Sequence, residues 1–132
     1  MTAWAGRLIV LFGAAHTVLA LAWMRAARHA GDWFSGALRH DDLAAMSAAN
    51  SALWLSLNSF GIPLVLIGLT VLWLDRRGIT PPRFIVWVLG LWTVQCAIVL
   101  TFTPWPITAV ATGLLIAGGR RAVPAPETAA TV

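Results

Sequence analysis

Polar side chains interrupt the long apolar runs of this chain, and these residues are the ones that could do chemistry. His16 lies in the first run, Asn58 and Ser59 in the second, and Gln95 in the third. An ionisable group inside an apolar membrane segment is a functional-site hypothesis by default, because burying it costs free energy. Imidazole also titrates near neutral pH and can therefore exchange protons. His16 is the candidate catalytic residue, and all four side chains are candidate ligand-binding residues.

Helical spacing places tryptophans beside two of these polar groups. Trp54 is four residues before Asn58, and Trp92 is three residues before Gln95, so each pair shares a helix face. Trp54 and Trp92 are therefore predicted to form apolar walls around a small polar cavity. Such a cavity would bind a small lipophilic molecule, with or without converting it.

Structural explanations compete with this functional one. Asn58 and Gln95 could join helices through hydrogen bonds worth roughly 0.6–2 kcal/mol each. A neutral His16 bonded to Asn58 or to a backbone carbonyl would also be structural. Nucleophilic catalysis by Ser56 or Ser59 lacks an acid within the apolar runs to orient the imidazole. The residues therefore leave binding, conversion and helix packing open.

Cofactors and metals fit the sequence less well. Haem would need a second buried axial ligand, but His29 and His40 lie outside the apolar runs. A surface metal site built from the loop residues would match no known ligand spacing; these residues are His29, Asp32, His40, Asp41 and Asp42. Cys96 is the single cysteine, so no thiolate cluster can form. We expect no cofactor and no metal.

Composition predicts an integral membrane protein. Only 11% of the 132 residues are charged, 59% are hydrophobic, and the mean hydropathy is +0.80, whereas soluble domains carry roughly 25% charged residues. Eight tryptophans fit the same class, because this residue collects at membrane interfaces. The nine arginines flank the apolar runs, which favours lipid headgroups as partners and gives no patch for nucleic acid.

Four apolar runs predict an all-α bundle of four transmembrane helices, at about 5–24, 51–74, 84–102 and 105–119. The first run could instead be a cleaved signal peptide, but His16 interrupts it and Trp23 follows the small residues where cleavage would fall. The last run is short for a full crossing. Residues 1–121 form the predicted domain, and 122–132 a disordered tail.

Two features shape the second span and the loop before it. Pro63 should bend the span where Ser56, Asn58 and Ser59 lie. The interfacial loop, residues 25–50, contains Asp41, which is the predicted N-cap of a helix that begins near Asp42.

Arginine counts predict the orientation of the bundle. Six arginines fall on the side of the termini and three fall in the 25–50 loop. The positive-inside rule then places both termini in the cytoplasm and the protein, as a multi-pass chain, in the cell inner membrane.

Three segments resemble a known family: TAWAGRLIVLFGAAHTVLALAW, DWFSGAL and SLNSFGIPLVLIGLTVLWLDRRGITPP. They are similar to small four-span bacterial membrane proteins, mainly actinobacterial, that form a domain of unknown function. The resemblance covers about Ala3 to Gly119 and implies fold and membrane location, with no activity to transfer.

Two functions of different classes follow. The first is a monomeric or homodimeric bundle that binds a lipophile in a cavity open to the outer leaflet. The alternative is an accessory subunit that packs against another membrane protein and has no chemistry of its own. Its support is a ridge of small residues at Ala109, Gly113 and Ala117, which membrane helices use to pack.

Overall fold

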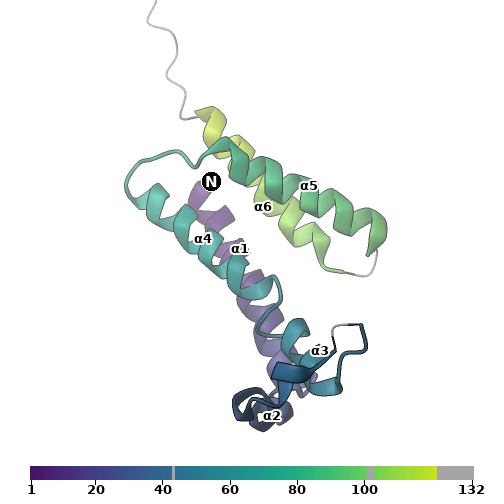
Figure 1. Cartoon of the computed structure of the whole chain (residues 1–132). Coiled ribbons are helices and arrows are strands. Elements are labelled where there is room, and N and C mark those ends of the chain that lie inside the picture. Colours follow the sequence, from purple (N-terminus) through teal and green to yellow (C-terminus); the bar gives the residue numbers. More distant parts are fainter. Residues whose placement is uncertain (43, 101–102, 122–132) are drawn as a thin grey trace, which may run out of the picture. The chain divides into compact units, whose positions relative to one another are not determined.

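The computed structural model describes residues 1–42, 44–100 and 103–121, and in these residues the chain is helical without a strand. This confirms the predicted all-α class. Six α-helices occur in the described residues, together with three short helices of other types (Figure 1). The α-helices are α1 (Thr2–Val18), α2 (Ala30–Ser35), α3 (Ala48–Leu55), α4 (Gly61–Arg76), α5 (Arg83–Val99) and α6 (Trp105–Arg121). The others are the π-helix η1 (Leu19–Trp23) and the 3₁₀-helices η2 (Ala26–His29) and η3 (Ala37–His40).

One helix of the described residues is long and apolar enough to cross a membrane. It is α1 with its π-helical extension, Thr2–Trp23, with 22 residues and a hydropathy of 1.7. A signal sequence would pass the same test. Helices α4, α5 and α6 have 16, 17 and 17 residues, about 24–26 Å at 1.5 Å per residue, against a hydrocarbon core near 30 Å. The predicted four-span bundle is therefore not confirmed.

The predicted span 51–74 is divided into two helices. Helix α3 ends at Leu55 and α4 begins at Gly61. Between them, the Asn58 amide donates to the carbonyl of Leu53 at 3.0 Å. Pro63 lies in the first turn of α4, where a missing N–H removes no helical hydrogen bond. Ser56, Asn58 and Ser59, which were predicted to lie at a bend within one helix, therefore lie in a break between the two helices α3 and α4.

The 25–50 segment is helical over much of its length, and α3 starts later than predicted. The N-cap is Ser47, whose hydroxyl accepts a hydrogen bond from the Asn50 amide at 3.2 Å. Asp41 supports this cap, because its carboxylate accepts bonds from the Ser47 hydroxyl at 2.8 Å and the Ser47 amide at 3.1 Å. The predicted N-cap at Asp41 is wrong because a serine six residues later satisfies the first turn.

The chain divides into two compact units, which are described separately. Unit 1 comprises Met1–Leu8 and Gly68–Val132, and unit 2 comprises Ile9–Ile67. The division passes through α1 and α4. The predicted tail, 122–132, and the end of the predicted third span, 101–102, lie outside the described residues.

Unit 1 is organised around the pair α5 and α6 (Figure 1). One stripe of α5 is buried, and its residues are Ile85, Leu89, Thr93 and Cys96. The facing helix α6 buries Thr108, Ala111 and Leu115. This spacing of three, four and seven residues is that of one helical face.

Unit 2 brings α1 and α4 together through glycines. A Cβ atom on Gly13 would lie 2.5 Å from the carbonyl oxygen of Gly61, and one on Gly61 would lie 2.8 Å from the carbonyl oxygen of Gly13. Small residues that allow such backbone contact are the usual means of packing membrane helices. This contact positions α1 against the start of α4.

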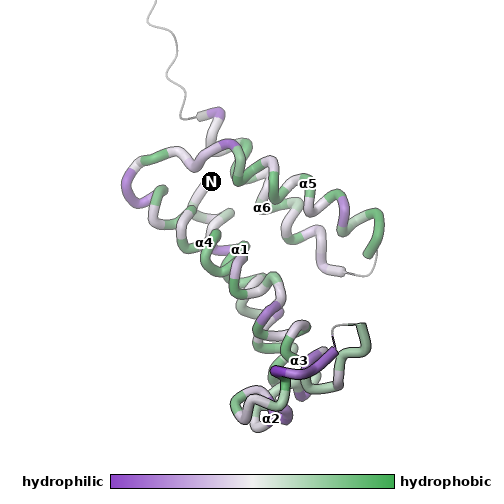
Figure 2. The backbone as a smooth tube through the Cα atoms, in the orientation of Figure 1, coloured by the Kyte–Doolittle hydropathy of each residue, from purple (hydrophilic) through white to green (hydrophobic). Residues whose placement is uncertain are grey.

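Hydrophilic residues are concentrated in two connections, the segment before α3 and the connection from α4 to α5 (Figure 2).

Candidate functional site

His16 and Ser59 are the two predicted site residues that the structure brings together. The Nε2 atom of His16 lies 2.9 Å from the Ser59 hydroxyl, and both side chains are half-buried. His16 comes from α1, and Ser59 comes from the break that precedes α4. Which group donates depends on the imidazole tautomer. We call these two residues the His16–Ser59 pair.

Aromatic rings enclose one side of the pair. The rings of His16 and Phe60 have centroids 4.0 Å apart and an interplanar angle of 34°. Phe60 in turn stacks on Phe12, with centroids 5.9 Å apart and an angle of 20°. Phe12 and His16 are four residues apart on α1, so both present to the same face. The imidazole therefore lies between a hydroxyl and an aromatic surface.

The glycine contact explains why the pair can form. Gly13 lies three residues before His16, and Gly61 lies two residues after Ser59. Because the two backbones approach closely at these glycines, the imidazole reaches the serine without a bridging residue. The Thr17 hydroxyl donates to the Gly13 carbonyl at 3.2 Å and so adds no polar group to the pair.

The chemistry of the pair suits binding better than nucleophilic attack. All carboxylates of unit 2 lie in the 25–50 segment, at Asp32, Asp41 and Asp42, so none accompanies His16 on its helix. A serine nucleophile needs a base that is itself oriented by a third group. The pair can donate and accept hydrogen bonds next to an aromatic surface, which is what a neutral lipophile with one polar group requires.

The other predicted ligand-binding residues of unit 2 are placed differently. Asn58 is exposed, and Trp54 is 49% exposed. The prediction assumed one continuous helix over residues 51–74. Helix α3 instead ends at Leu55, so the residues that follow do not continue on the same helical faces. Asn58 therefore does not join the His16–Ser59 pair in an enclosed cavity.

The polar group that α5 buries is Thr93, which the sequence analysis did not select. Gln95 is exposed and Trp92 is half-buried. Two residues along a helix correspond to a rotation of about 200°, so Gln95 faces away when Thr93 faces α6. Thr93 lies on the stripe formed by Ile85 and Leu89, and this periodicity could have identified it.

Thr93 and Thr108 form a closed polar contact within unit 1. Their hydroxyls lie 3.0 Å apart, and they are 6% and 3% exposed. The Thr108 hydroxyl also donates to the carbonyl of Trp105 at 2.8 Å, and the Thr93 hydroxyl lies 2.7 Å from the carbonyl of Leu89. Each oxygen thus has its partners within the helix pair, which makes this contact structural.

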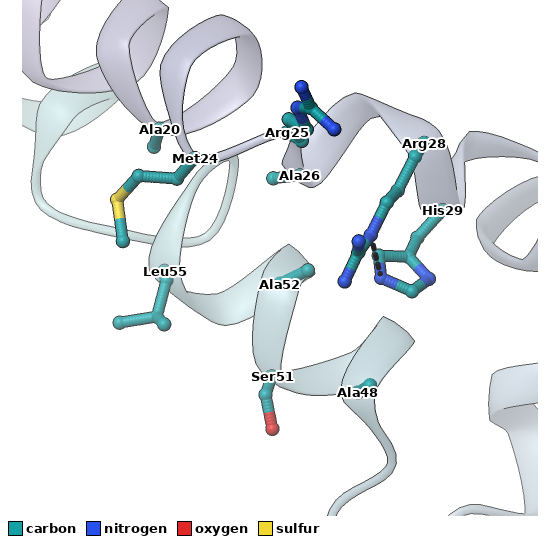
Figure 3. Close-up of a pocket in the computed structure, with 10 residues that line it drawn as sticks. All are labelled: Ala20, Met24, Arg25, Ala26, Arg28, His29, Ala48, Ser51, Ala52 and Leu55. Atoms are coloured by element: carbon teal, nitrogen blue, oxygen red, sulfur yellow. Dashed lines mark hydrogen bonds between the residues drawn. The ribbon is translucent and has the colours of Figure 1, made fainter.

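A cavity of about 250 Å³ lies where α1 ends, and the sequence analysis did not predict it there. We call it the Arg28 pocket. Its residues come from η1, from η2 and the two residues that precede it, and from α3 (Figure 3). They are Ala20, Met24, Arg25, Ala26, Arg28, His29, Ala48, Ser51, Ala52 and Leu55. The sequence analysis assigned the arginines to topology and lipid headgroups, and the spacing of three residues between Arg25 and Arg28 was the signal that could have found the pocket.

The loop residues considered for a metal do not gather into one site. His29 Nδ1 lies 3.5 Å from the carboxylate of Asp32. Asp41 and Asp42 instead accept backbone hydrogen bonds, from Ser47 and Ala44 respectively. Over the part of the chain that the structure describes, no group of three or more such side chains could hold a metal ion.

The chain belongs to a family of unknown function, DUF6463, which matches residues 1–122. This confirms the predicted membership in a family of unknown function, and it extends the match beyond the expected Ala3–Gly119. The expected bacterial origin and the four spans stay predictions. Neither the curated proteins nor the solved structures contain a match to the sequence.

Proposed function

We propose that this family member is an integral membrane protein that binds a small lipophilic molecule against the His16–Ser59 pair. The observation that carries the proposal is the half-buried imidazole of an apolar helix, held 2.9 Å from a hydroxyl and in tilted ring contact with Phe60. Among the described residues, His16 makes this one hydrogen bond, through Nε2. Its Nδ1 atom is the group we assign to the polar end of the ligand.

The exposed apolar surface supports the membrane location. The core helix of a soluble protein is mostly buried, but only 28% of the apolar window in Thr2–Trp23 is buried. On α5, Trp87 is 77% exposed, and Leu91 and Ile98 are each 75% exposed. A soluble monomer rarely exposes contiguous apolar patches of this kind. We assign these faces to the acyl chains of a bilayer.

The packing of the first helix favours a retained span over a cleaved signal peptide. Ala5 and Ile9 are 0% and 2% exposed, so α1 contributes to the core of each unit. Loss of residues 1–22 would remove His16 together with these contacts. An intact mass that includes Met1 or Thr2 supports retention, whereas a mature chain that begins at Trp23 contradicts it.

We retain the four-crossing topology, with both termini in the cytoplasm, as part of the proposal. The count of six arginines against three supports it. Helices of 16 and 17 residues can cross where the bilayer thins or where flanking arginines extend to the headgroups. Single cysteines placed at Gly31 and Gly78, in a chain with Cys96 replaced by Ala, should react with an impermeant maleimide from opposite sides of the membrane.

The binding proposal is tested by purifying the full chain in mild detergent. Native mass spectrometry with lipid analysis should show a co-purifying lipophile on the wild type. His16→Leu should weaken retention of the lipophile by about 5- to 150-fold, since a lost hydrogen bond at a desolvated polar group costs about 1–3 kcal/mol. The helical circular dichroism should be unchanged. Thr112→Val is the matched control, because its hydroxyl bonds only within α6.

One outcome reverses the assignment of His16. If His16→Leu lowers the unfolding temperature strongly and no ligand is recovered from the wild type, the pair is structural. The proposed binding function would then fail.

The alternative function, an accessory subunit without its own chemistry, has one observation in its favour. Gly113 is exposed, and a Cβ atom there would meet nothing within 4 Å among the described residues. The ridge that it forms with Ala109 and Ala117 is thus available to another helix. A photo-crosslinker at Gly113 that captures a single heterologous membrane protein supports this function, whereas contact with the chain's own helices opposes it.

A further inference from the structure

A relay of side chains holds one guanidinium at the rim of the Arg28 pocket. The Nε atom of Arg28 donates a hydrogen bond to Nε2 of His29 at 3.1 Å. Since arginine can only donate, His29 accepts through Nε2 and carries its proton on Nδ1. That nitrogen lies 3.5 Å from the carboxylate of Asp32, and the His29 side chain is 18% exposed. The relay uses Nε, and the terminal nitrogens of Arg28 make no hydrogen bond among the described residues, so both can donate to an anion.

Arg25 adds a second positive charge through an unusual backbone conformation. Its φ angle is 57°, the only positive φ of a non-glycine residue in the described part of the chain. Such a conformation is uncommon for a long side chain. It lets the chain turn sharply from η1 into η2, which places Arg25 and Arg28 on the rim of one cavity.

The other end of the pocket is apolar. Ala20, which lines the pocket, is 2% exposed, whereas Met24 and Leu55 are 65% and 58% exposed. Figure 3 shows Arg28 and His29 together at one end, with Met24 and Leu55 at the other. A free inorganic anion would make no favourable contact with the apolar side chains of Met24 and Leu55. A ligand with an acidic head and an apolar chain would contact both ends.

The volume favours a ligand that is only partly enclosed. Pockets that hold whole small ligands measure about 300–1,000 Å³, and this cavity has about 250 Å³. It has room for an acidic group and the first carbons that follow it. The remaining chain would continue over the exposed Met24 and Leu55.

We propose that the Arg28 pocket binds the acidic head, a carboxylate or a phosphate monoester, of a single-chain amphiphile. The terminal nitrogens of Arg28 bind the head in a bidentate manner, Arg25 adds charge at the rim, and the first carbons lie against Ala20 and Ala52. The inference rests on the membrane location in the proposed function, which is where such an amphiphile is found. It is independent of the His16–Ser59 pair.

The test is binding of radiolabelled hexadecanoate to the full chain in a neutral detergent. Hexadecyl phosphate competes as a second acidic amphiphile, hexadecanol tests the chain without the charge, and acetate and inorganic phosphate test the head without the chain. The acidic amphiphiles should bind, and the other three probes should compete at least about tenfold less well, since both ends of the pocket contribute. If acetate or phosphate competes equally, the site binds a free anion and the amphiphile is wrong.

Variants localise the binding. Arg25→Asn with Arg28→Gln removes both charges, and asparagine tolerates the backbone conformation of residue 25. Hexadecanoate affinity should fall at least about tenfold, as expected for lost charge-assisted hydrogen bonds. Arg39→Gln removes an arginine of the same segment that does not line the pocket, and its affinity should stay within about twofold. An equal loss in Arg39→Gln would mean that general surface charge attracts the acid, which overturns the site.

A steric variant keeps the test decisive if the charge variant folds poorly. Ala52→Trp fills the cavity and leaves both arginines in place, so hexadecanoate should be lost while helical circular dichroism is kept. Unchanged binding in this variant overturns the proposal. His16→Leu separates the two proposals: if it loses its co-purifying lipophile while the arginine and tryptophan variants bind hexadecanoate normally, the pocket assignment fails and the proposed function stands.

Discussion

Unit 1 and unit 2 both bury polar side chains between apolar helices, but they satisfy them in different ways. In unit 1, the hydroxyls of Thr93 and Thr108 bond to each other and to carbonyls of their own helices. In unit 2, the imidazole of His16 bonds to Ser59, which lies in a break between helices. The first arrangement uses the hydrogen-bonding capacity of its hydroxyls, whereas in the second the Nδ1 atom of His16 has no hydrogen bond among the described residues.

Because of this difference, we assign the proposed ligand binding to unit 2 and a structural role to unit 1. Two packed helices present regular faces, on which a hydroxyl finds its partner within one turn. A helix break presents side chains that follow no regular face, and the Arg28 pocket also lies beside such irregular backbone, at Arg25. Irregular backbone at membrane depth is tolerated where protein or water satisfies it, and such places commonly form binding sites.

The largest expected effect comes from the glycine contact that holds the His16–Ser59 pair together. Gly13→Ala places a Cβ atom 2.5 Å from the Gly61 carbonyl oxygen and 3.0 Å from the Val65 nitrogen, both backbone atoms that cannot turn aside. We expect a loss of about 1–3 kcal/mol in the free energy of unfolding. Unfolding in mixed detergent micelles, followed by circular dichroism, measures it.

The matched control is Gly113→Ala in α6. A Cβ atom there meets nothing within 4 Å, so this change should be neutral or stabilising by about 0.4–1 kcal/mol. Equal destabilisation by the two alanines would show that the close approach of α1 and α4 contributes nothing particular to unit 2.

The sequence predicted the helical class of the fold, and it selected His16 as the first candidate site residue. Apolar runs bounded by arginines predict helices, and an imidazole in the middle of such a run is conspicuous whatever surrounds it. Ser59 was also among the predicted residues, because it is a polar side chain in an apolar run, beside the bend predicted from Pro63. These features depend on local composition, which one sequence is enough to show.

What the sequence could not supply depends on the phase of each helix and on single backbone angles. Asn58 was assigned to a cavity on the assumption of one continuous helix, and the break at residues 56–60 removed that assumption. Gln95 was chosen as the polar side chain of the third apolar run, but rotation about α5 decides whether Gln95 or Thr93 faces α6. The Arg28 pocket depends on the positive φ of Arg25, which no residue preference would predict.

A pair of hydroxyl deletions sharpens the comparison between the units. Thr93→Val removes the contact with Thr108 and should cost about 0.6 kcal/mol in the free energy of unfolding, the average for membrane helix hydrogen bonds. Retention of the lipophile should be unchanged. Ser59→Ala should have the opposite effects: native mass spectra should show less bound lipophile, and the free energy of unfolding should change little. If Thr93→Val also empties the site, the units are coupled and unit 1 is more than a support.

The smallest effect concerns the cap of α3, the helix that forms one wall of the Arg28 pocket. Hydrogen bonds from the Ser47 hydroxyl, the Ser47 amide and the Asn50 side chain lower the pKa of Asp41 below its ordinary 3.8. A lowered pKa in the folded state means that the ionised carboxylate stabilises the fold at every pH above about 3.8, and that this contribution is lost as the pH falls through the lower, folded value. Asp41→Asn should therefore speed amide exchange at the start of α3 at pH 7.

The pH dependence separates this cap from a general effect of charge. Hydrogen exchange at α3, in wild type and in Asp41→Asn, should differ by a constant ratio from pH 7 down to about pH 4. The difference should shrink as the pH falls below 3.8 and should vanish once the pH is below the lowered pKa of Asp41 in the folded state. Asp42→Asn removes the same charge one residue away and leaves the Ser47 contacts intact, so α3 should keep its protection. Equal exchange in the two variants would mean that the cap is held by Ser47 alone. Asp41 would then not stabilise α3, the wall of the Arg28 pocket, and the segment before α3 would only connect the helices.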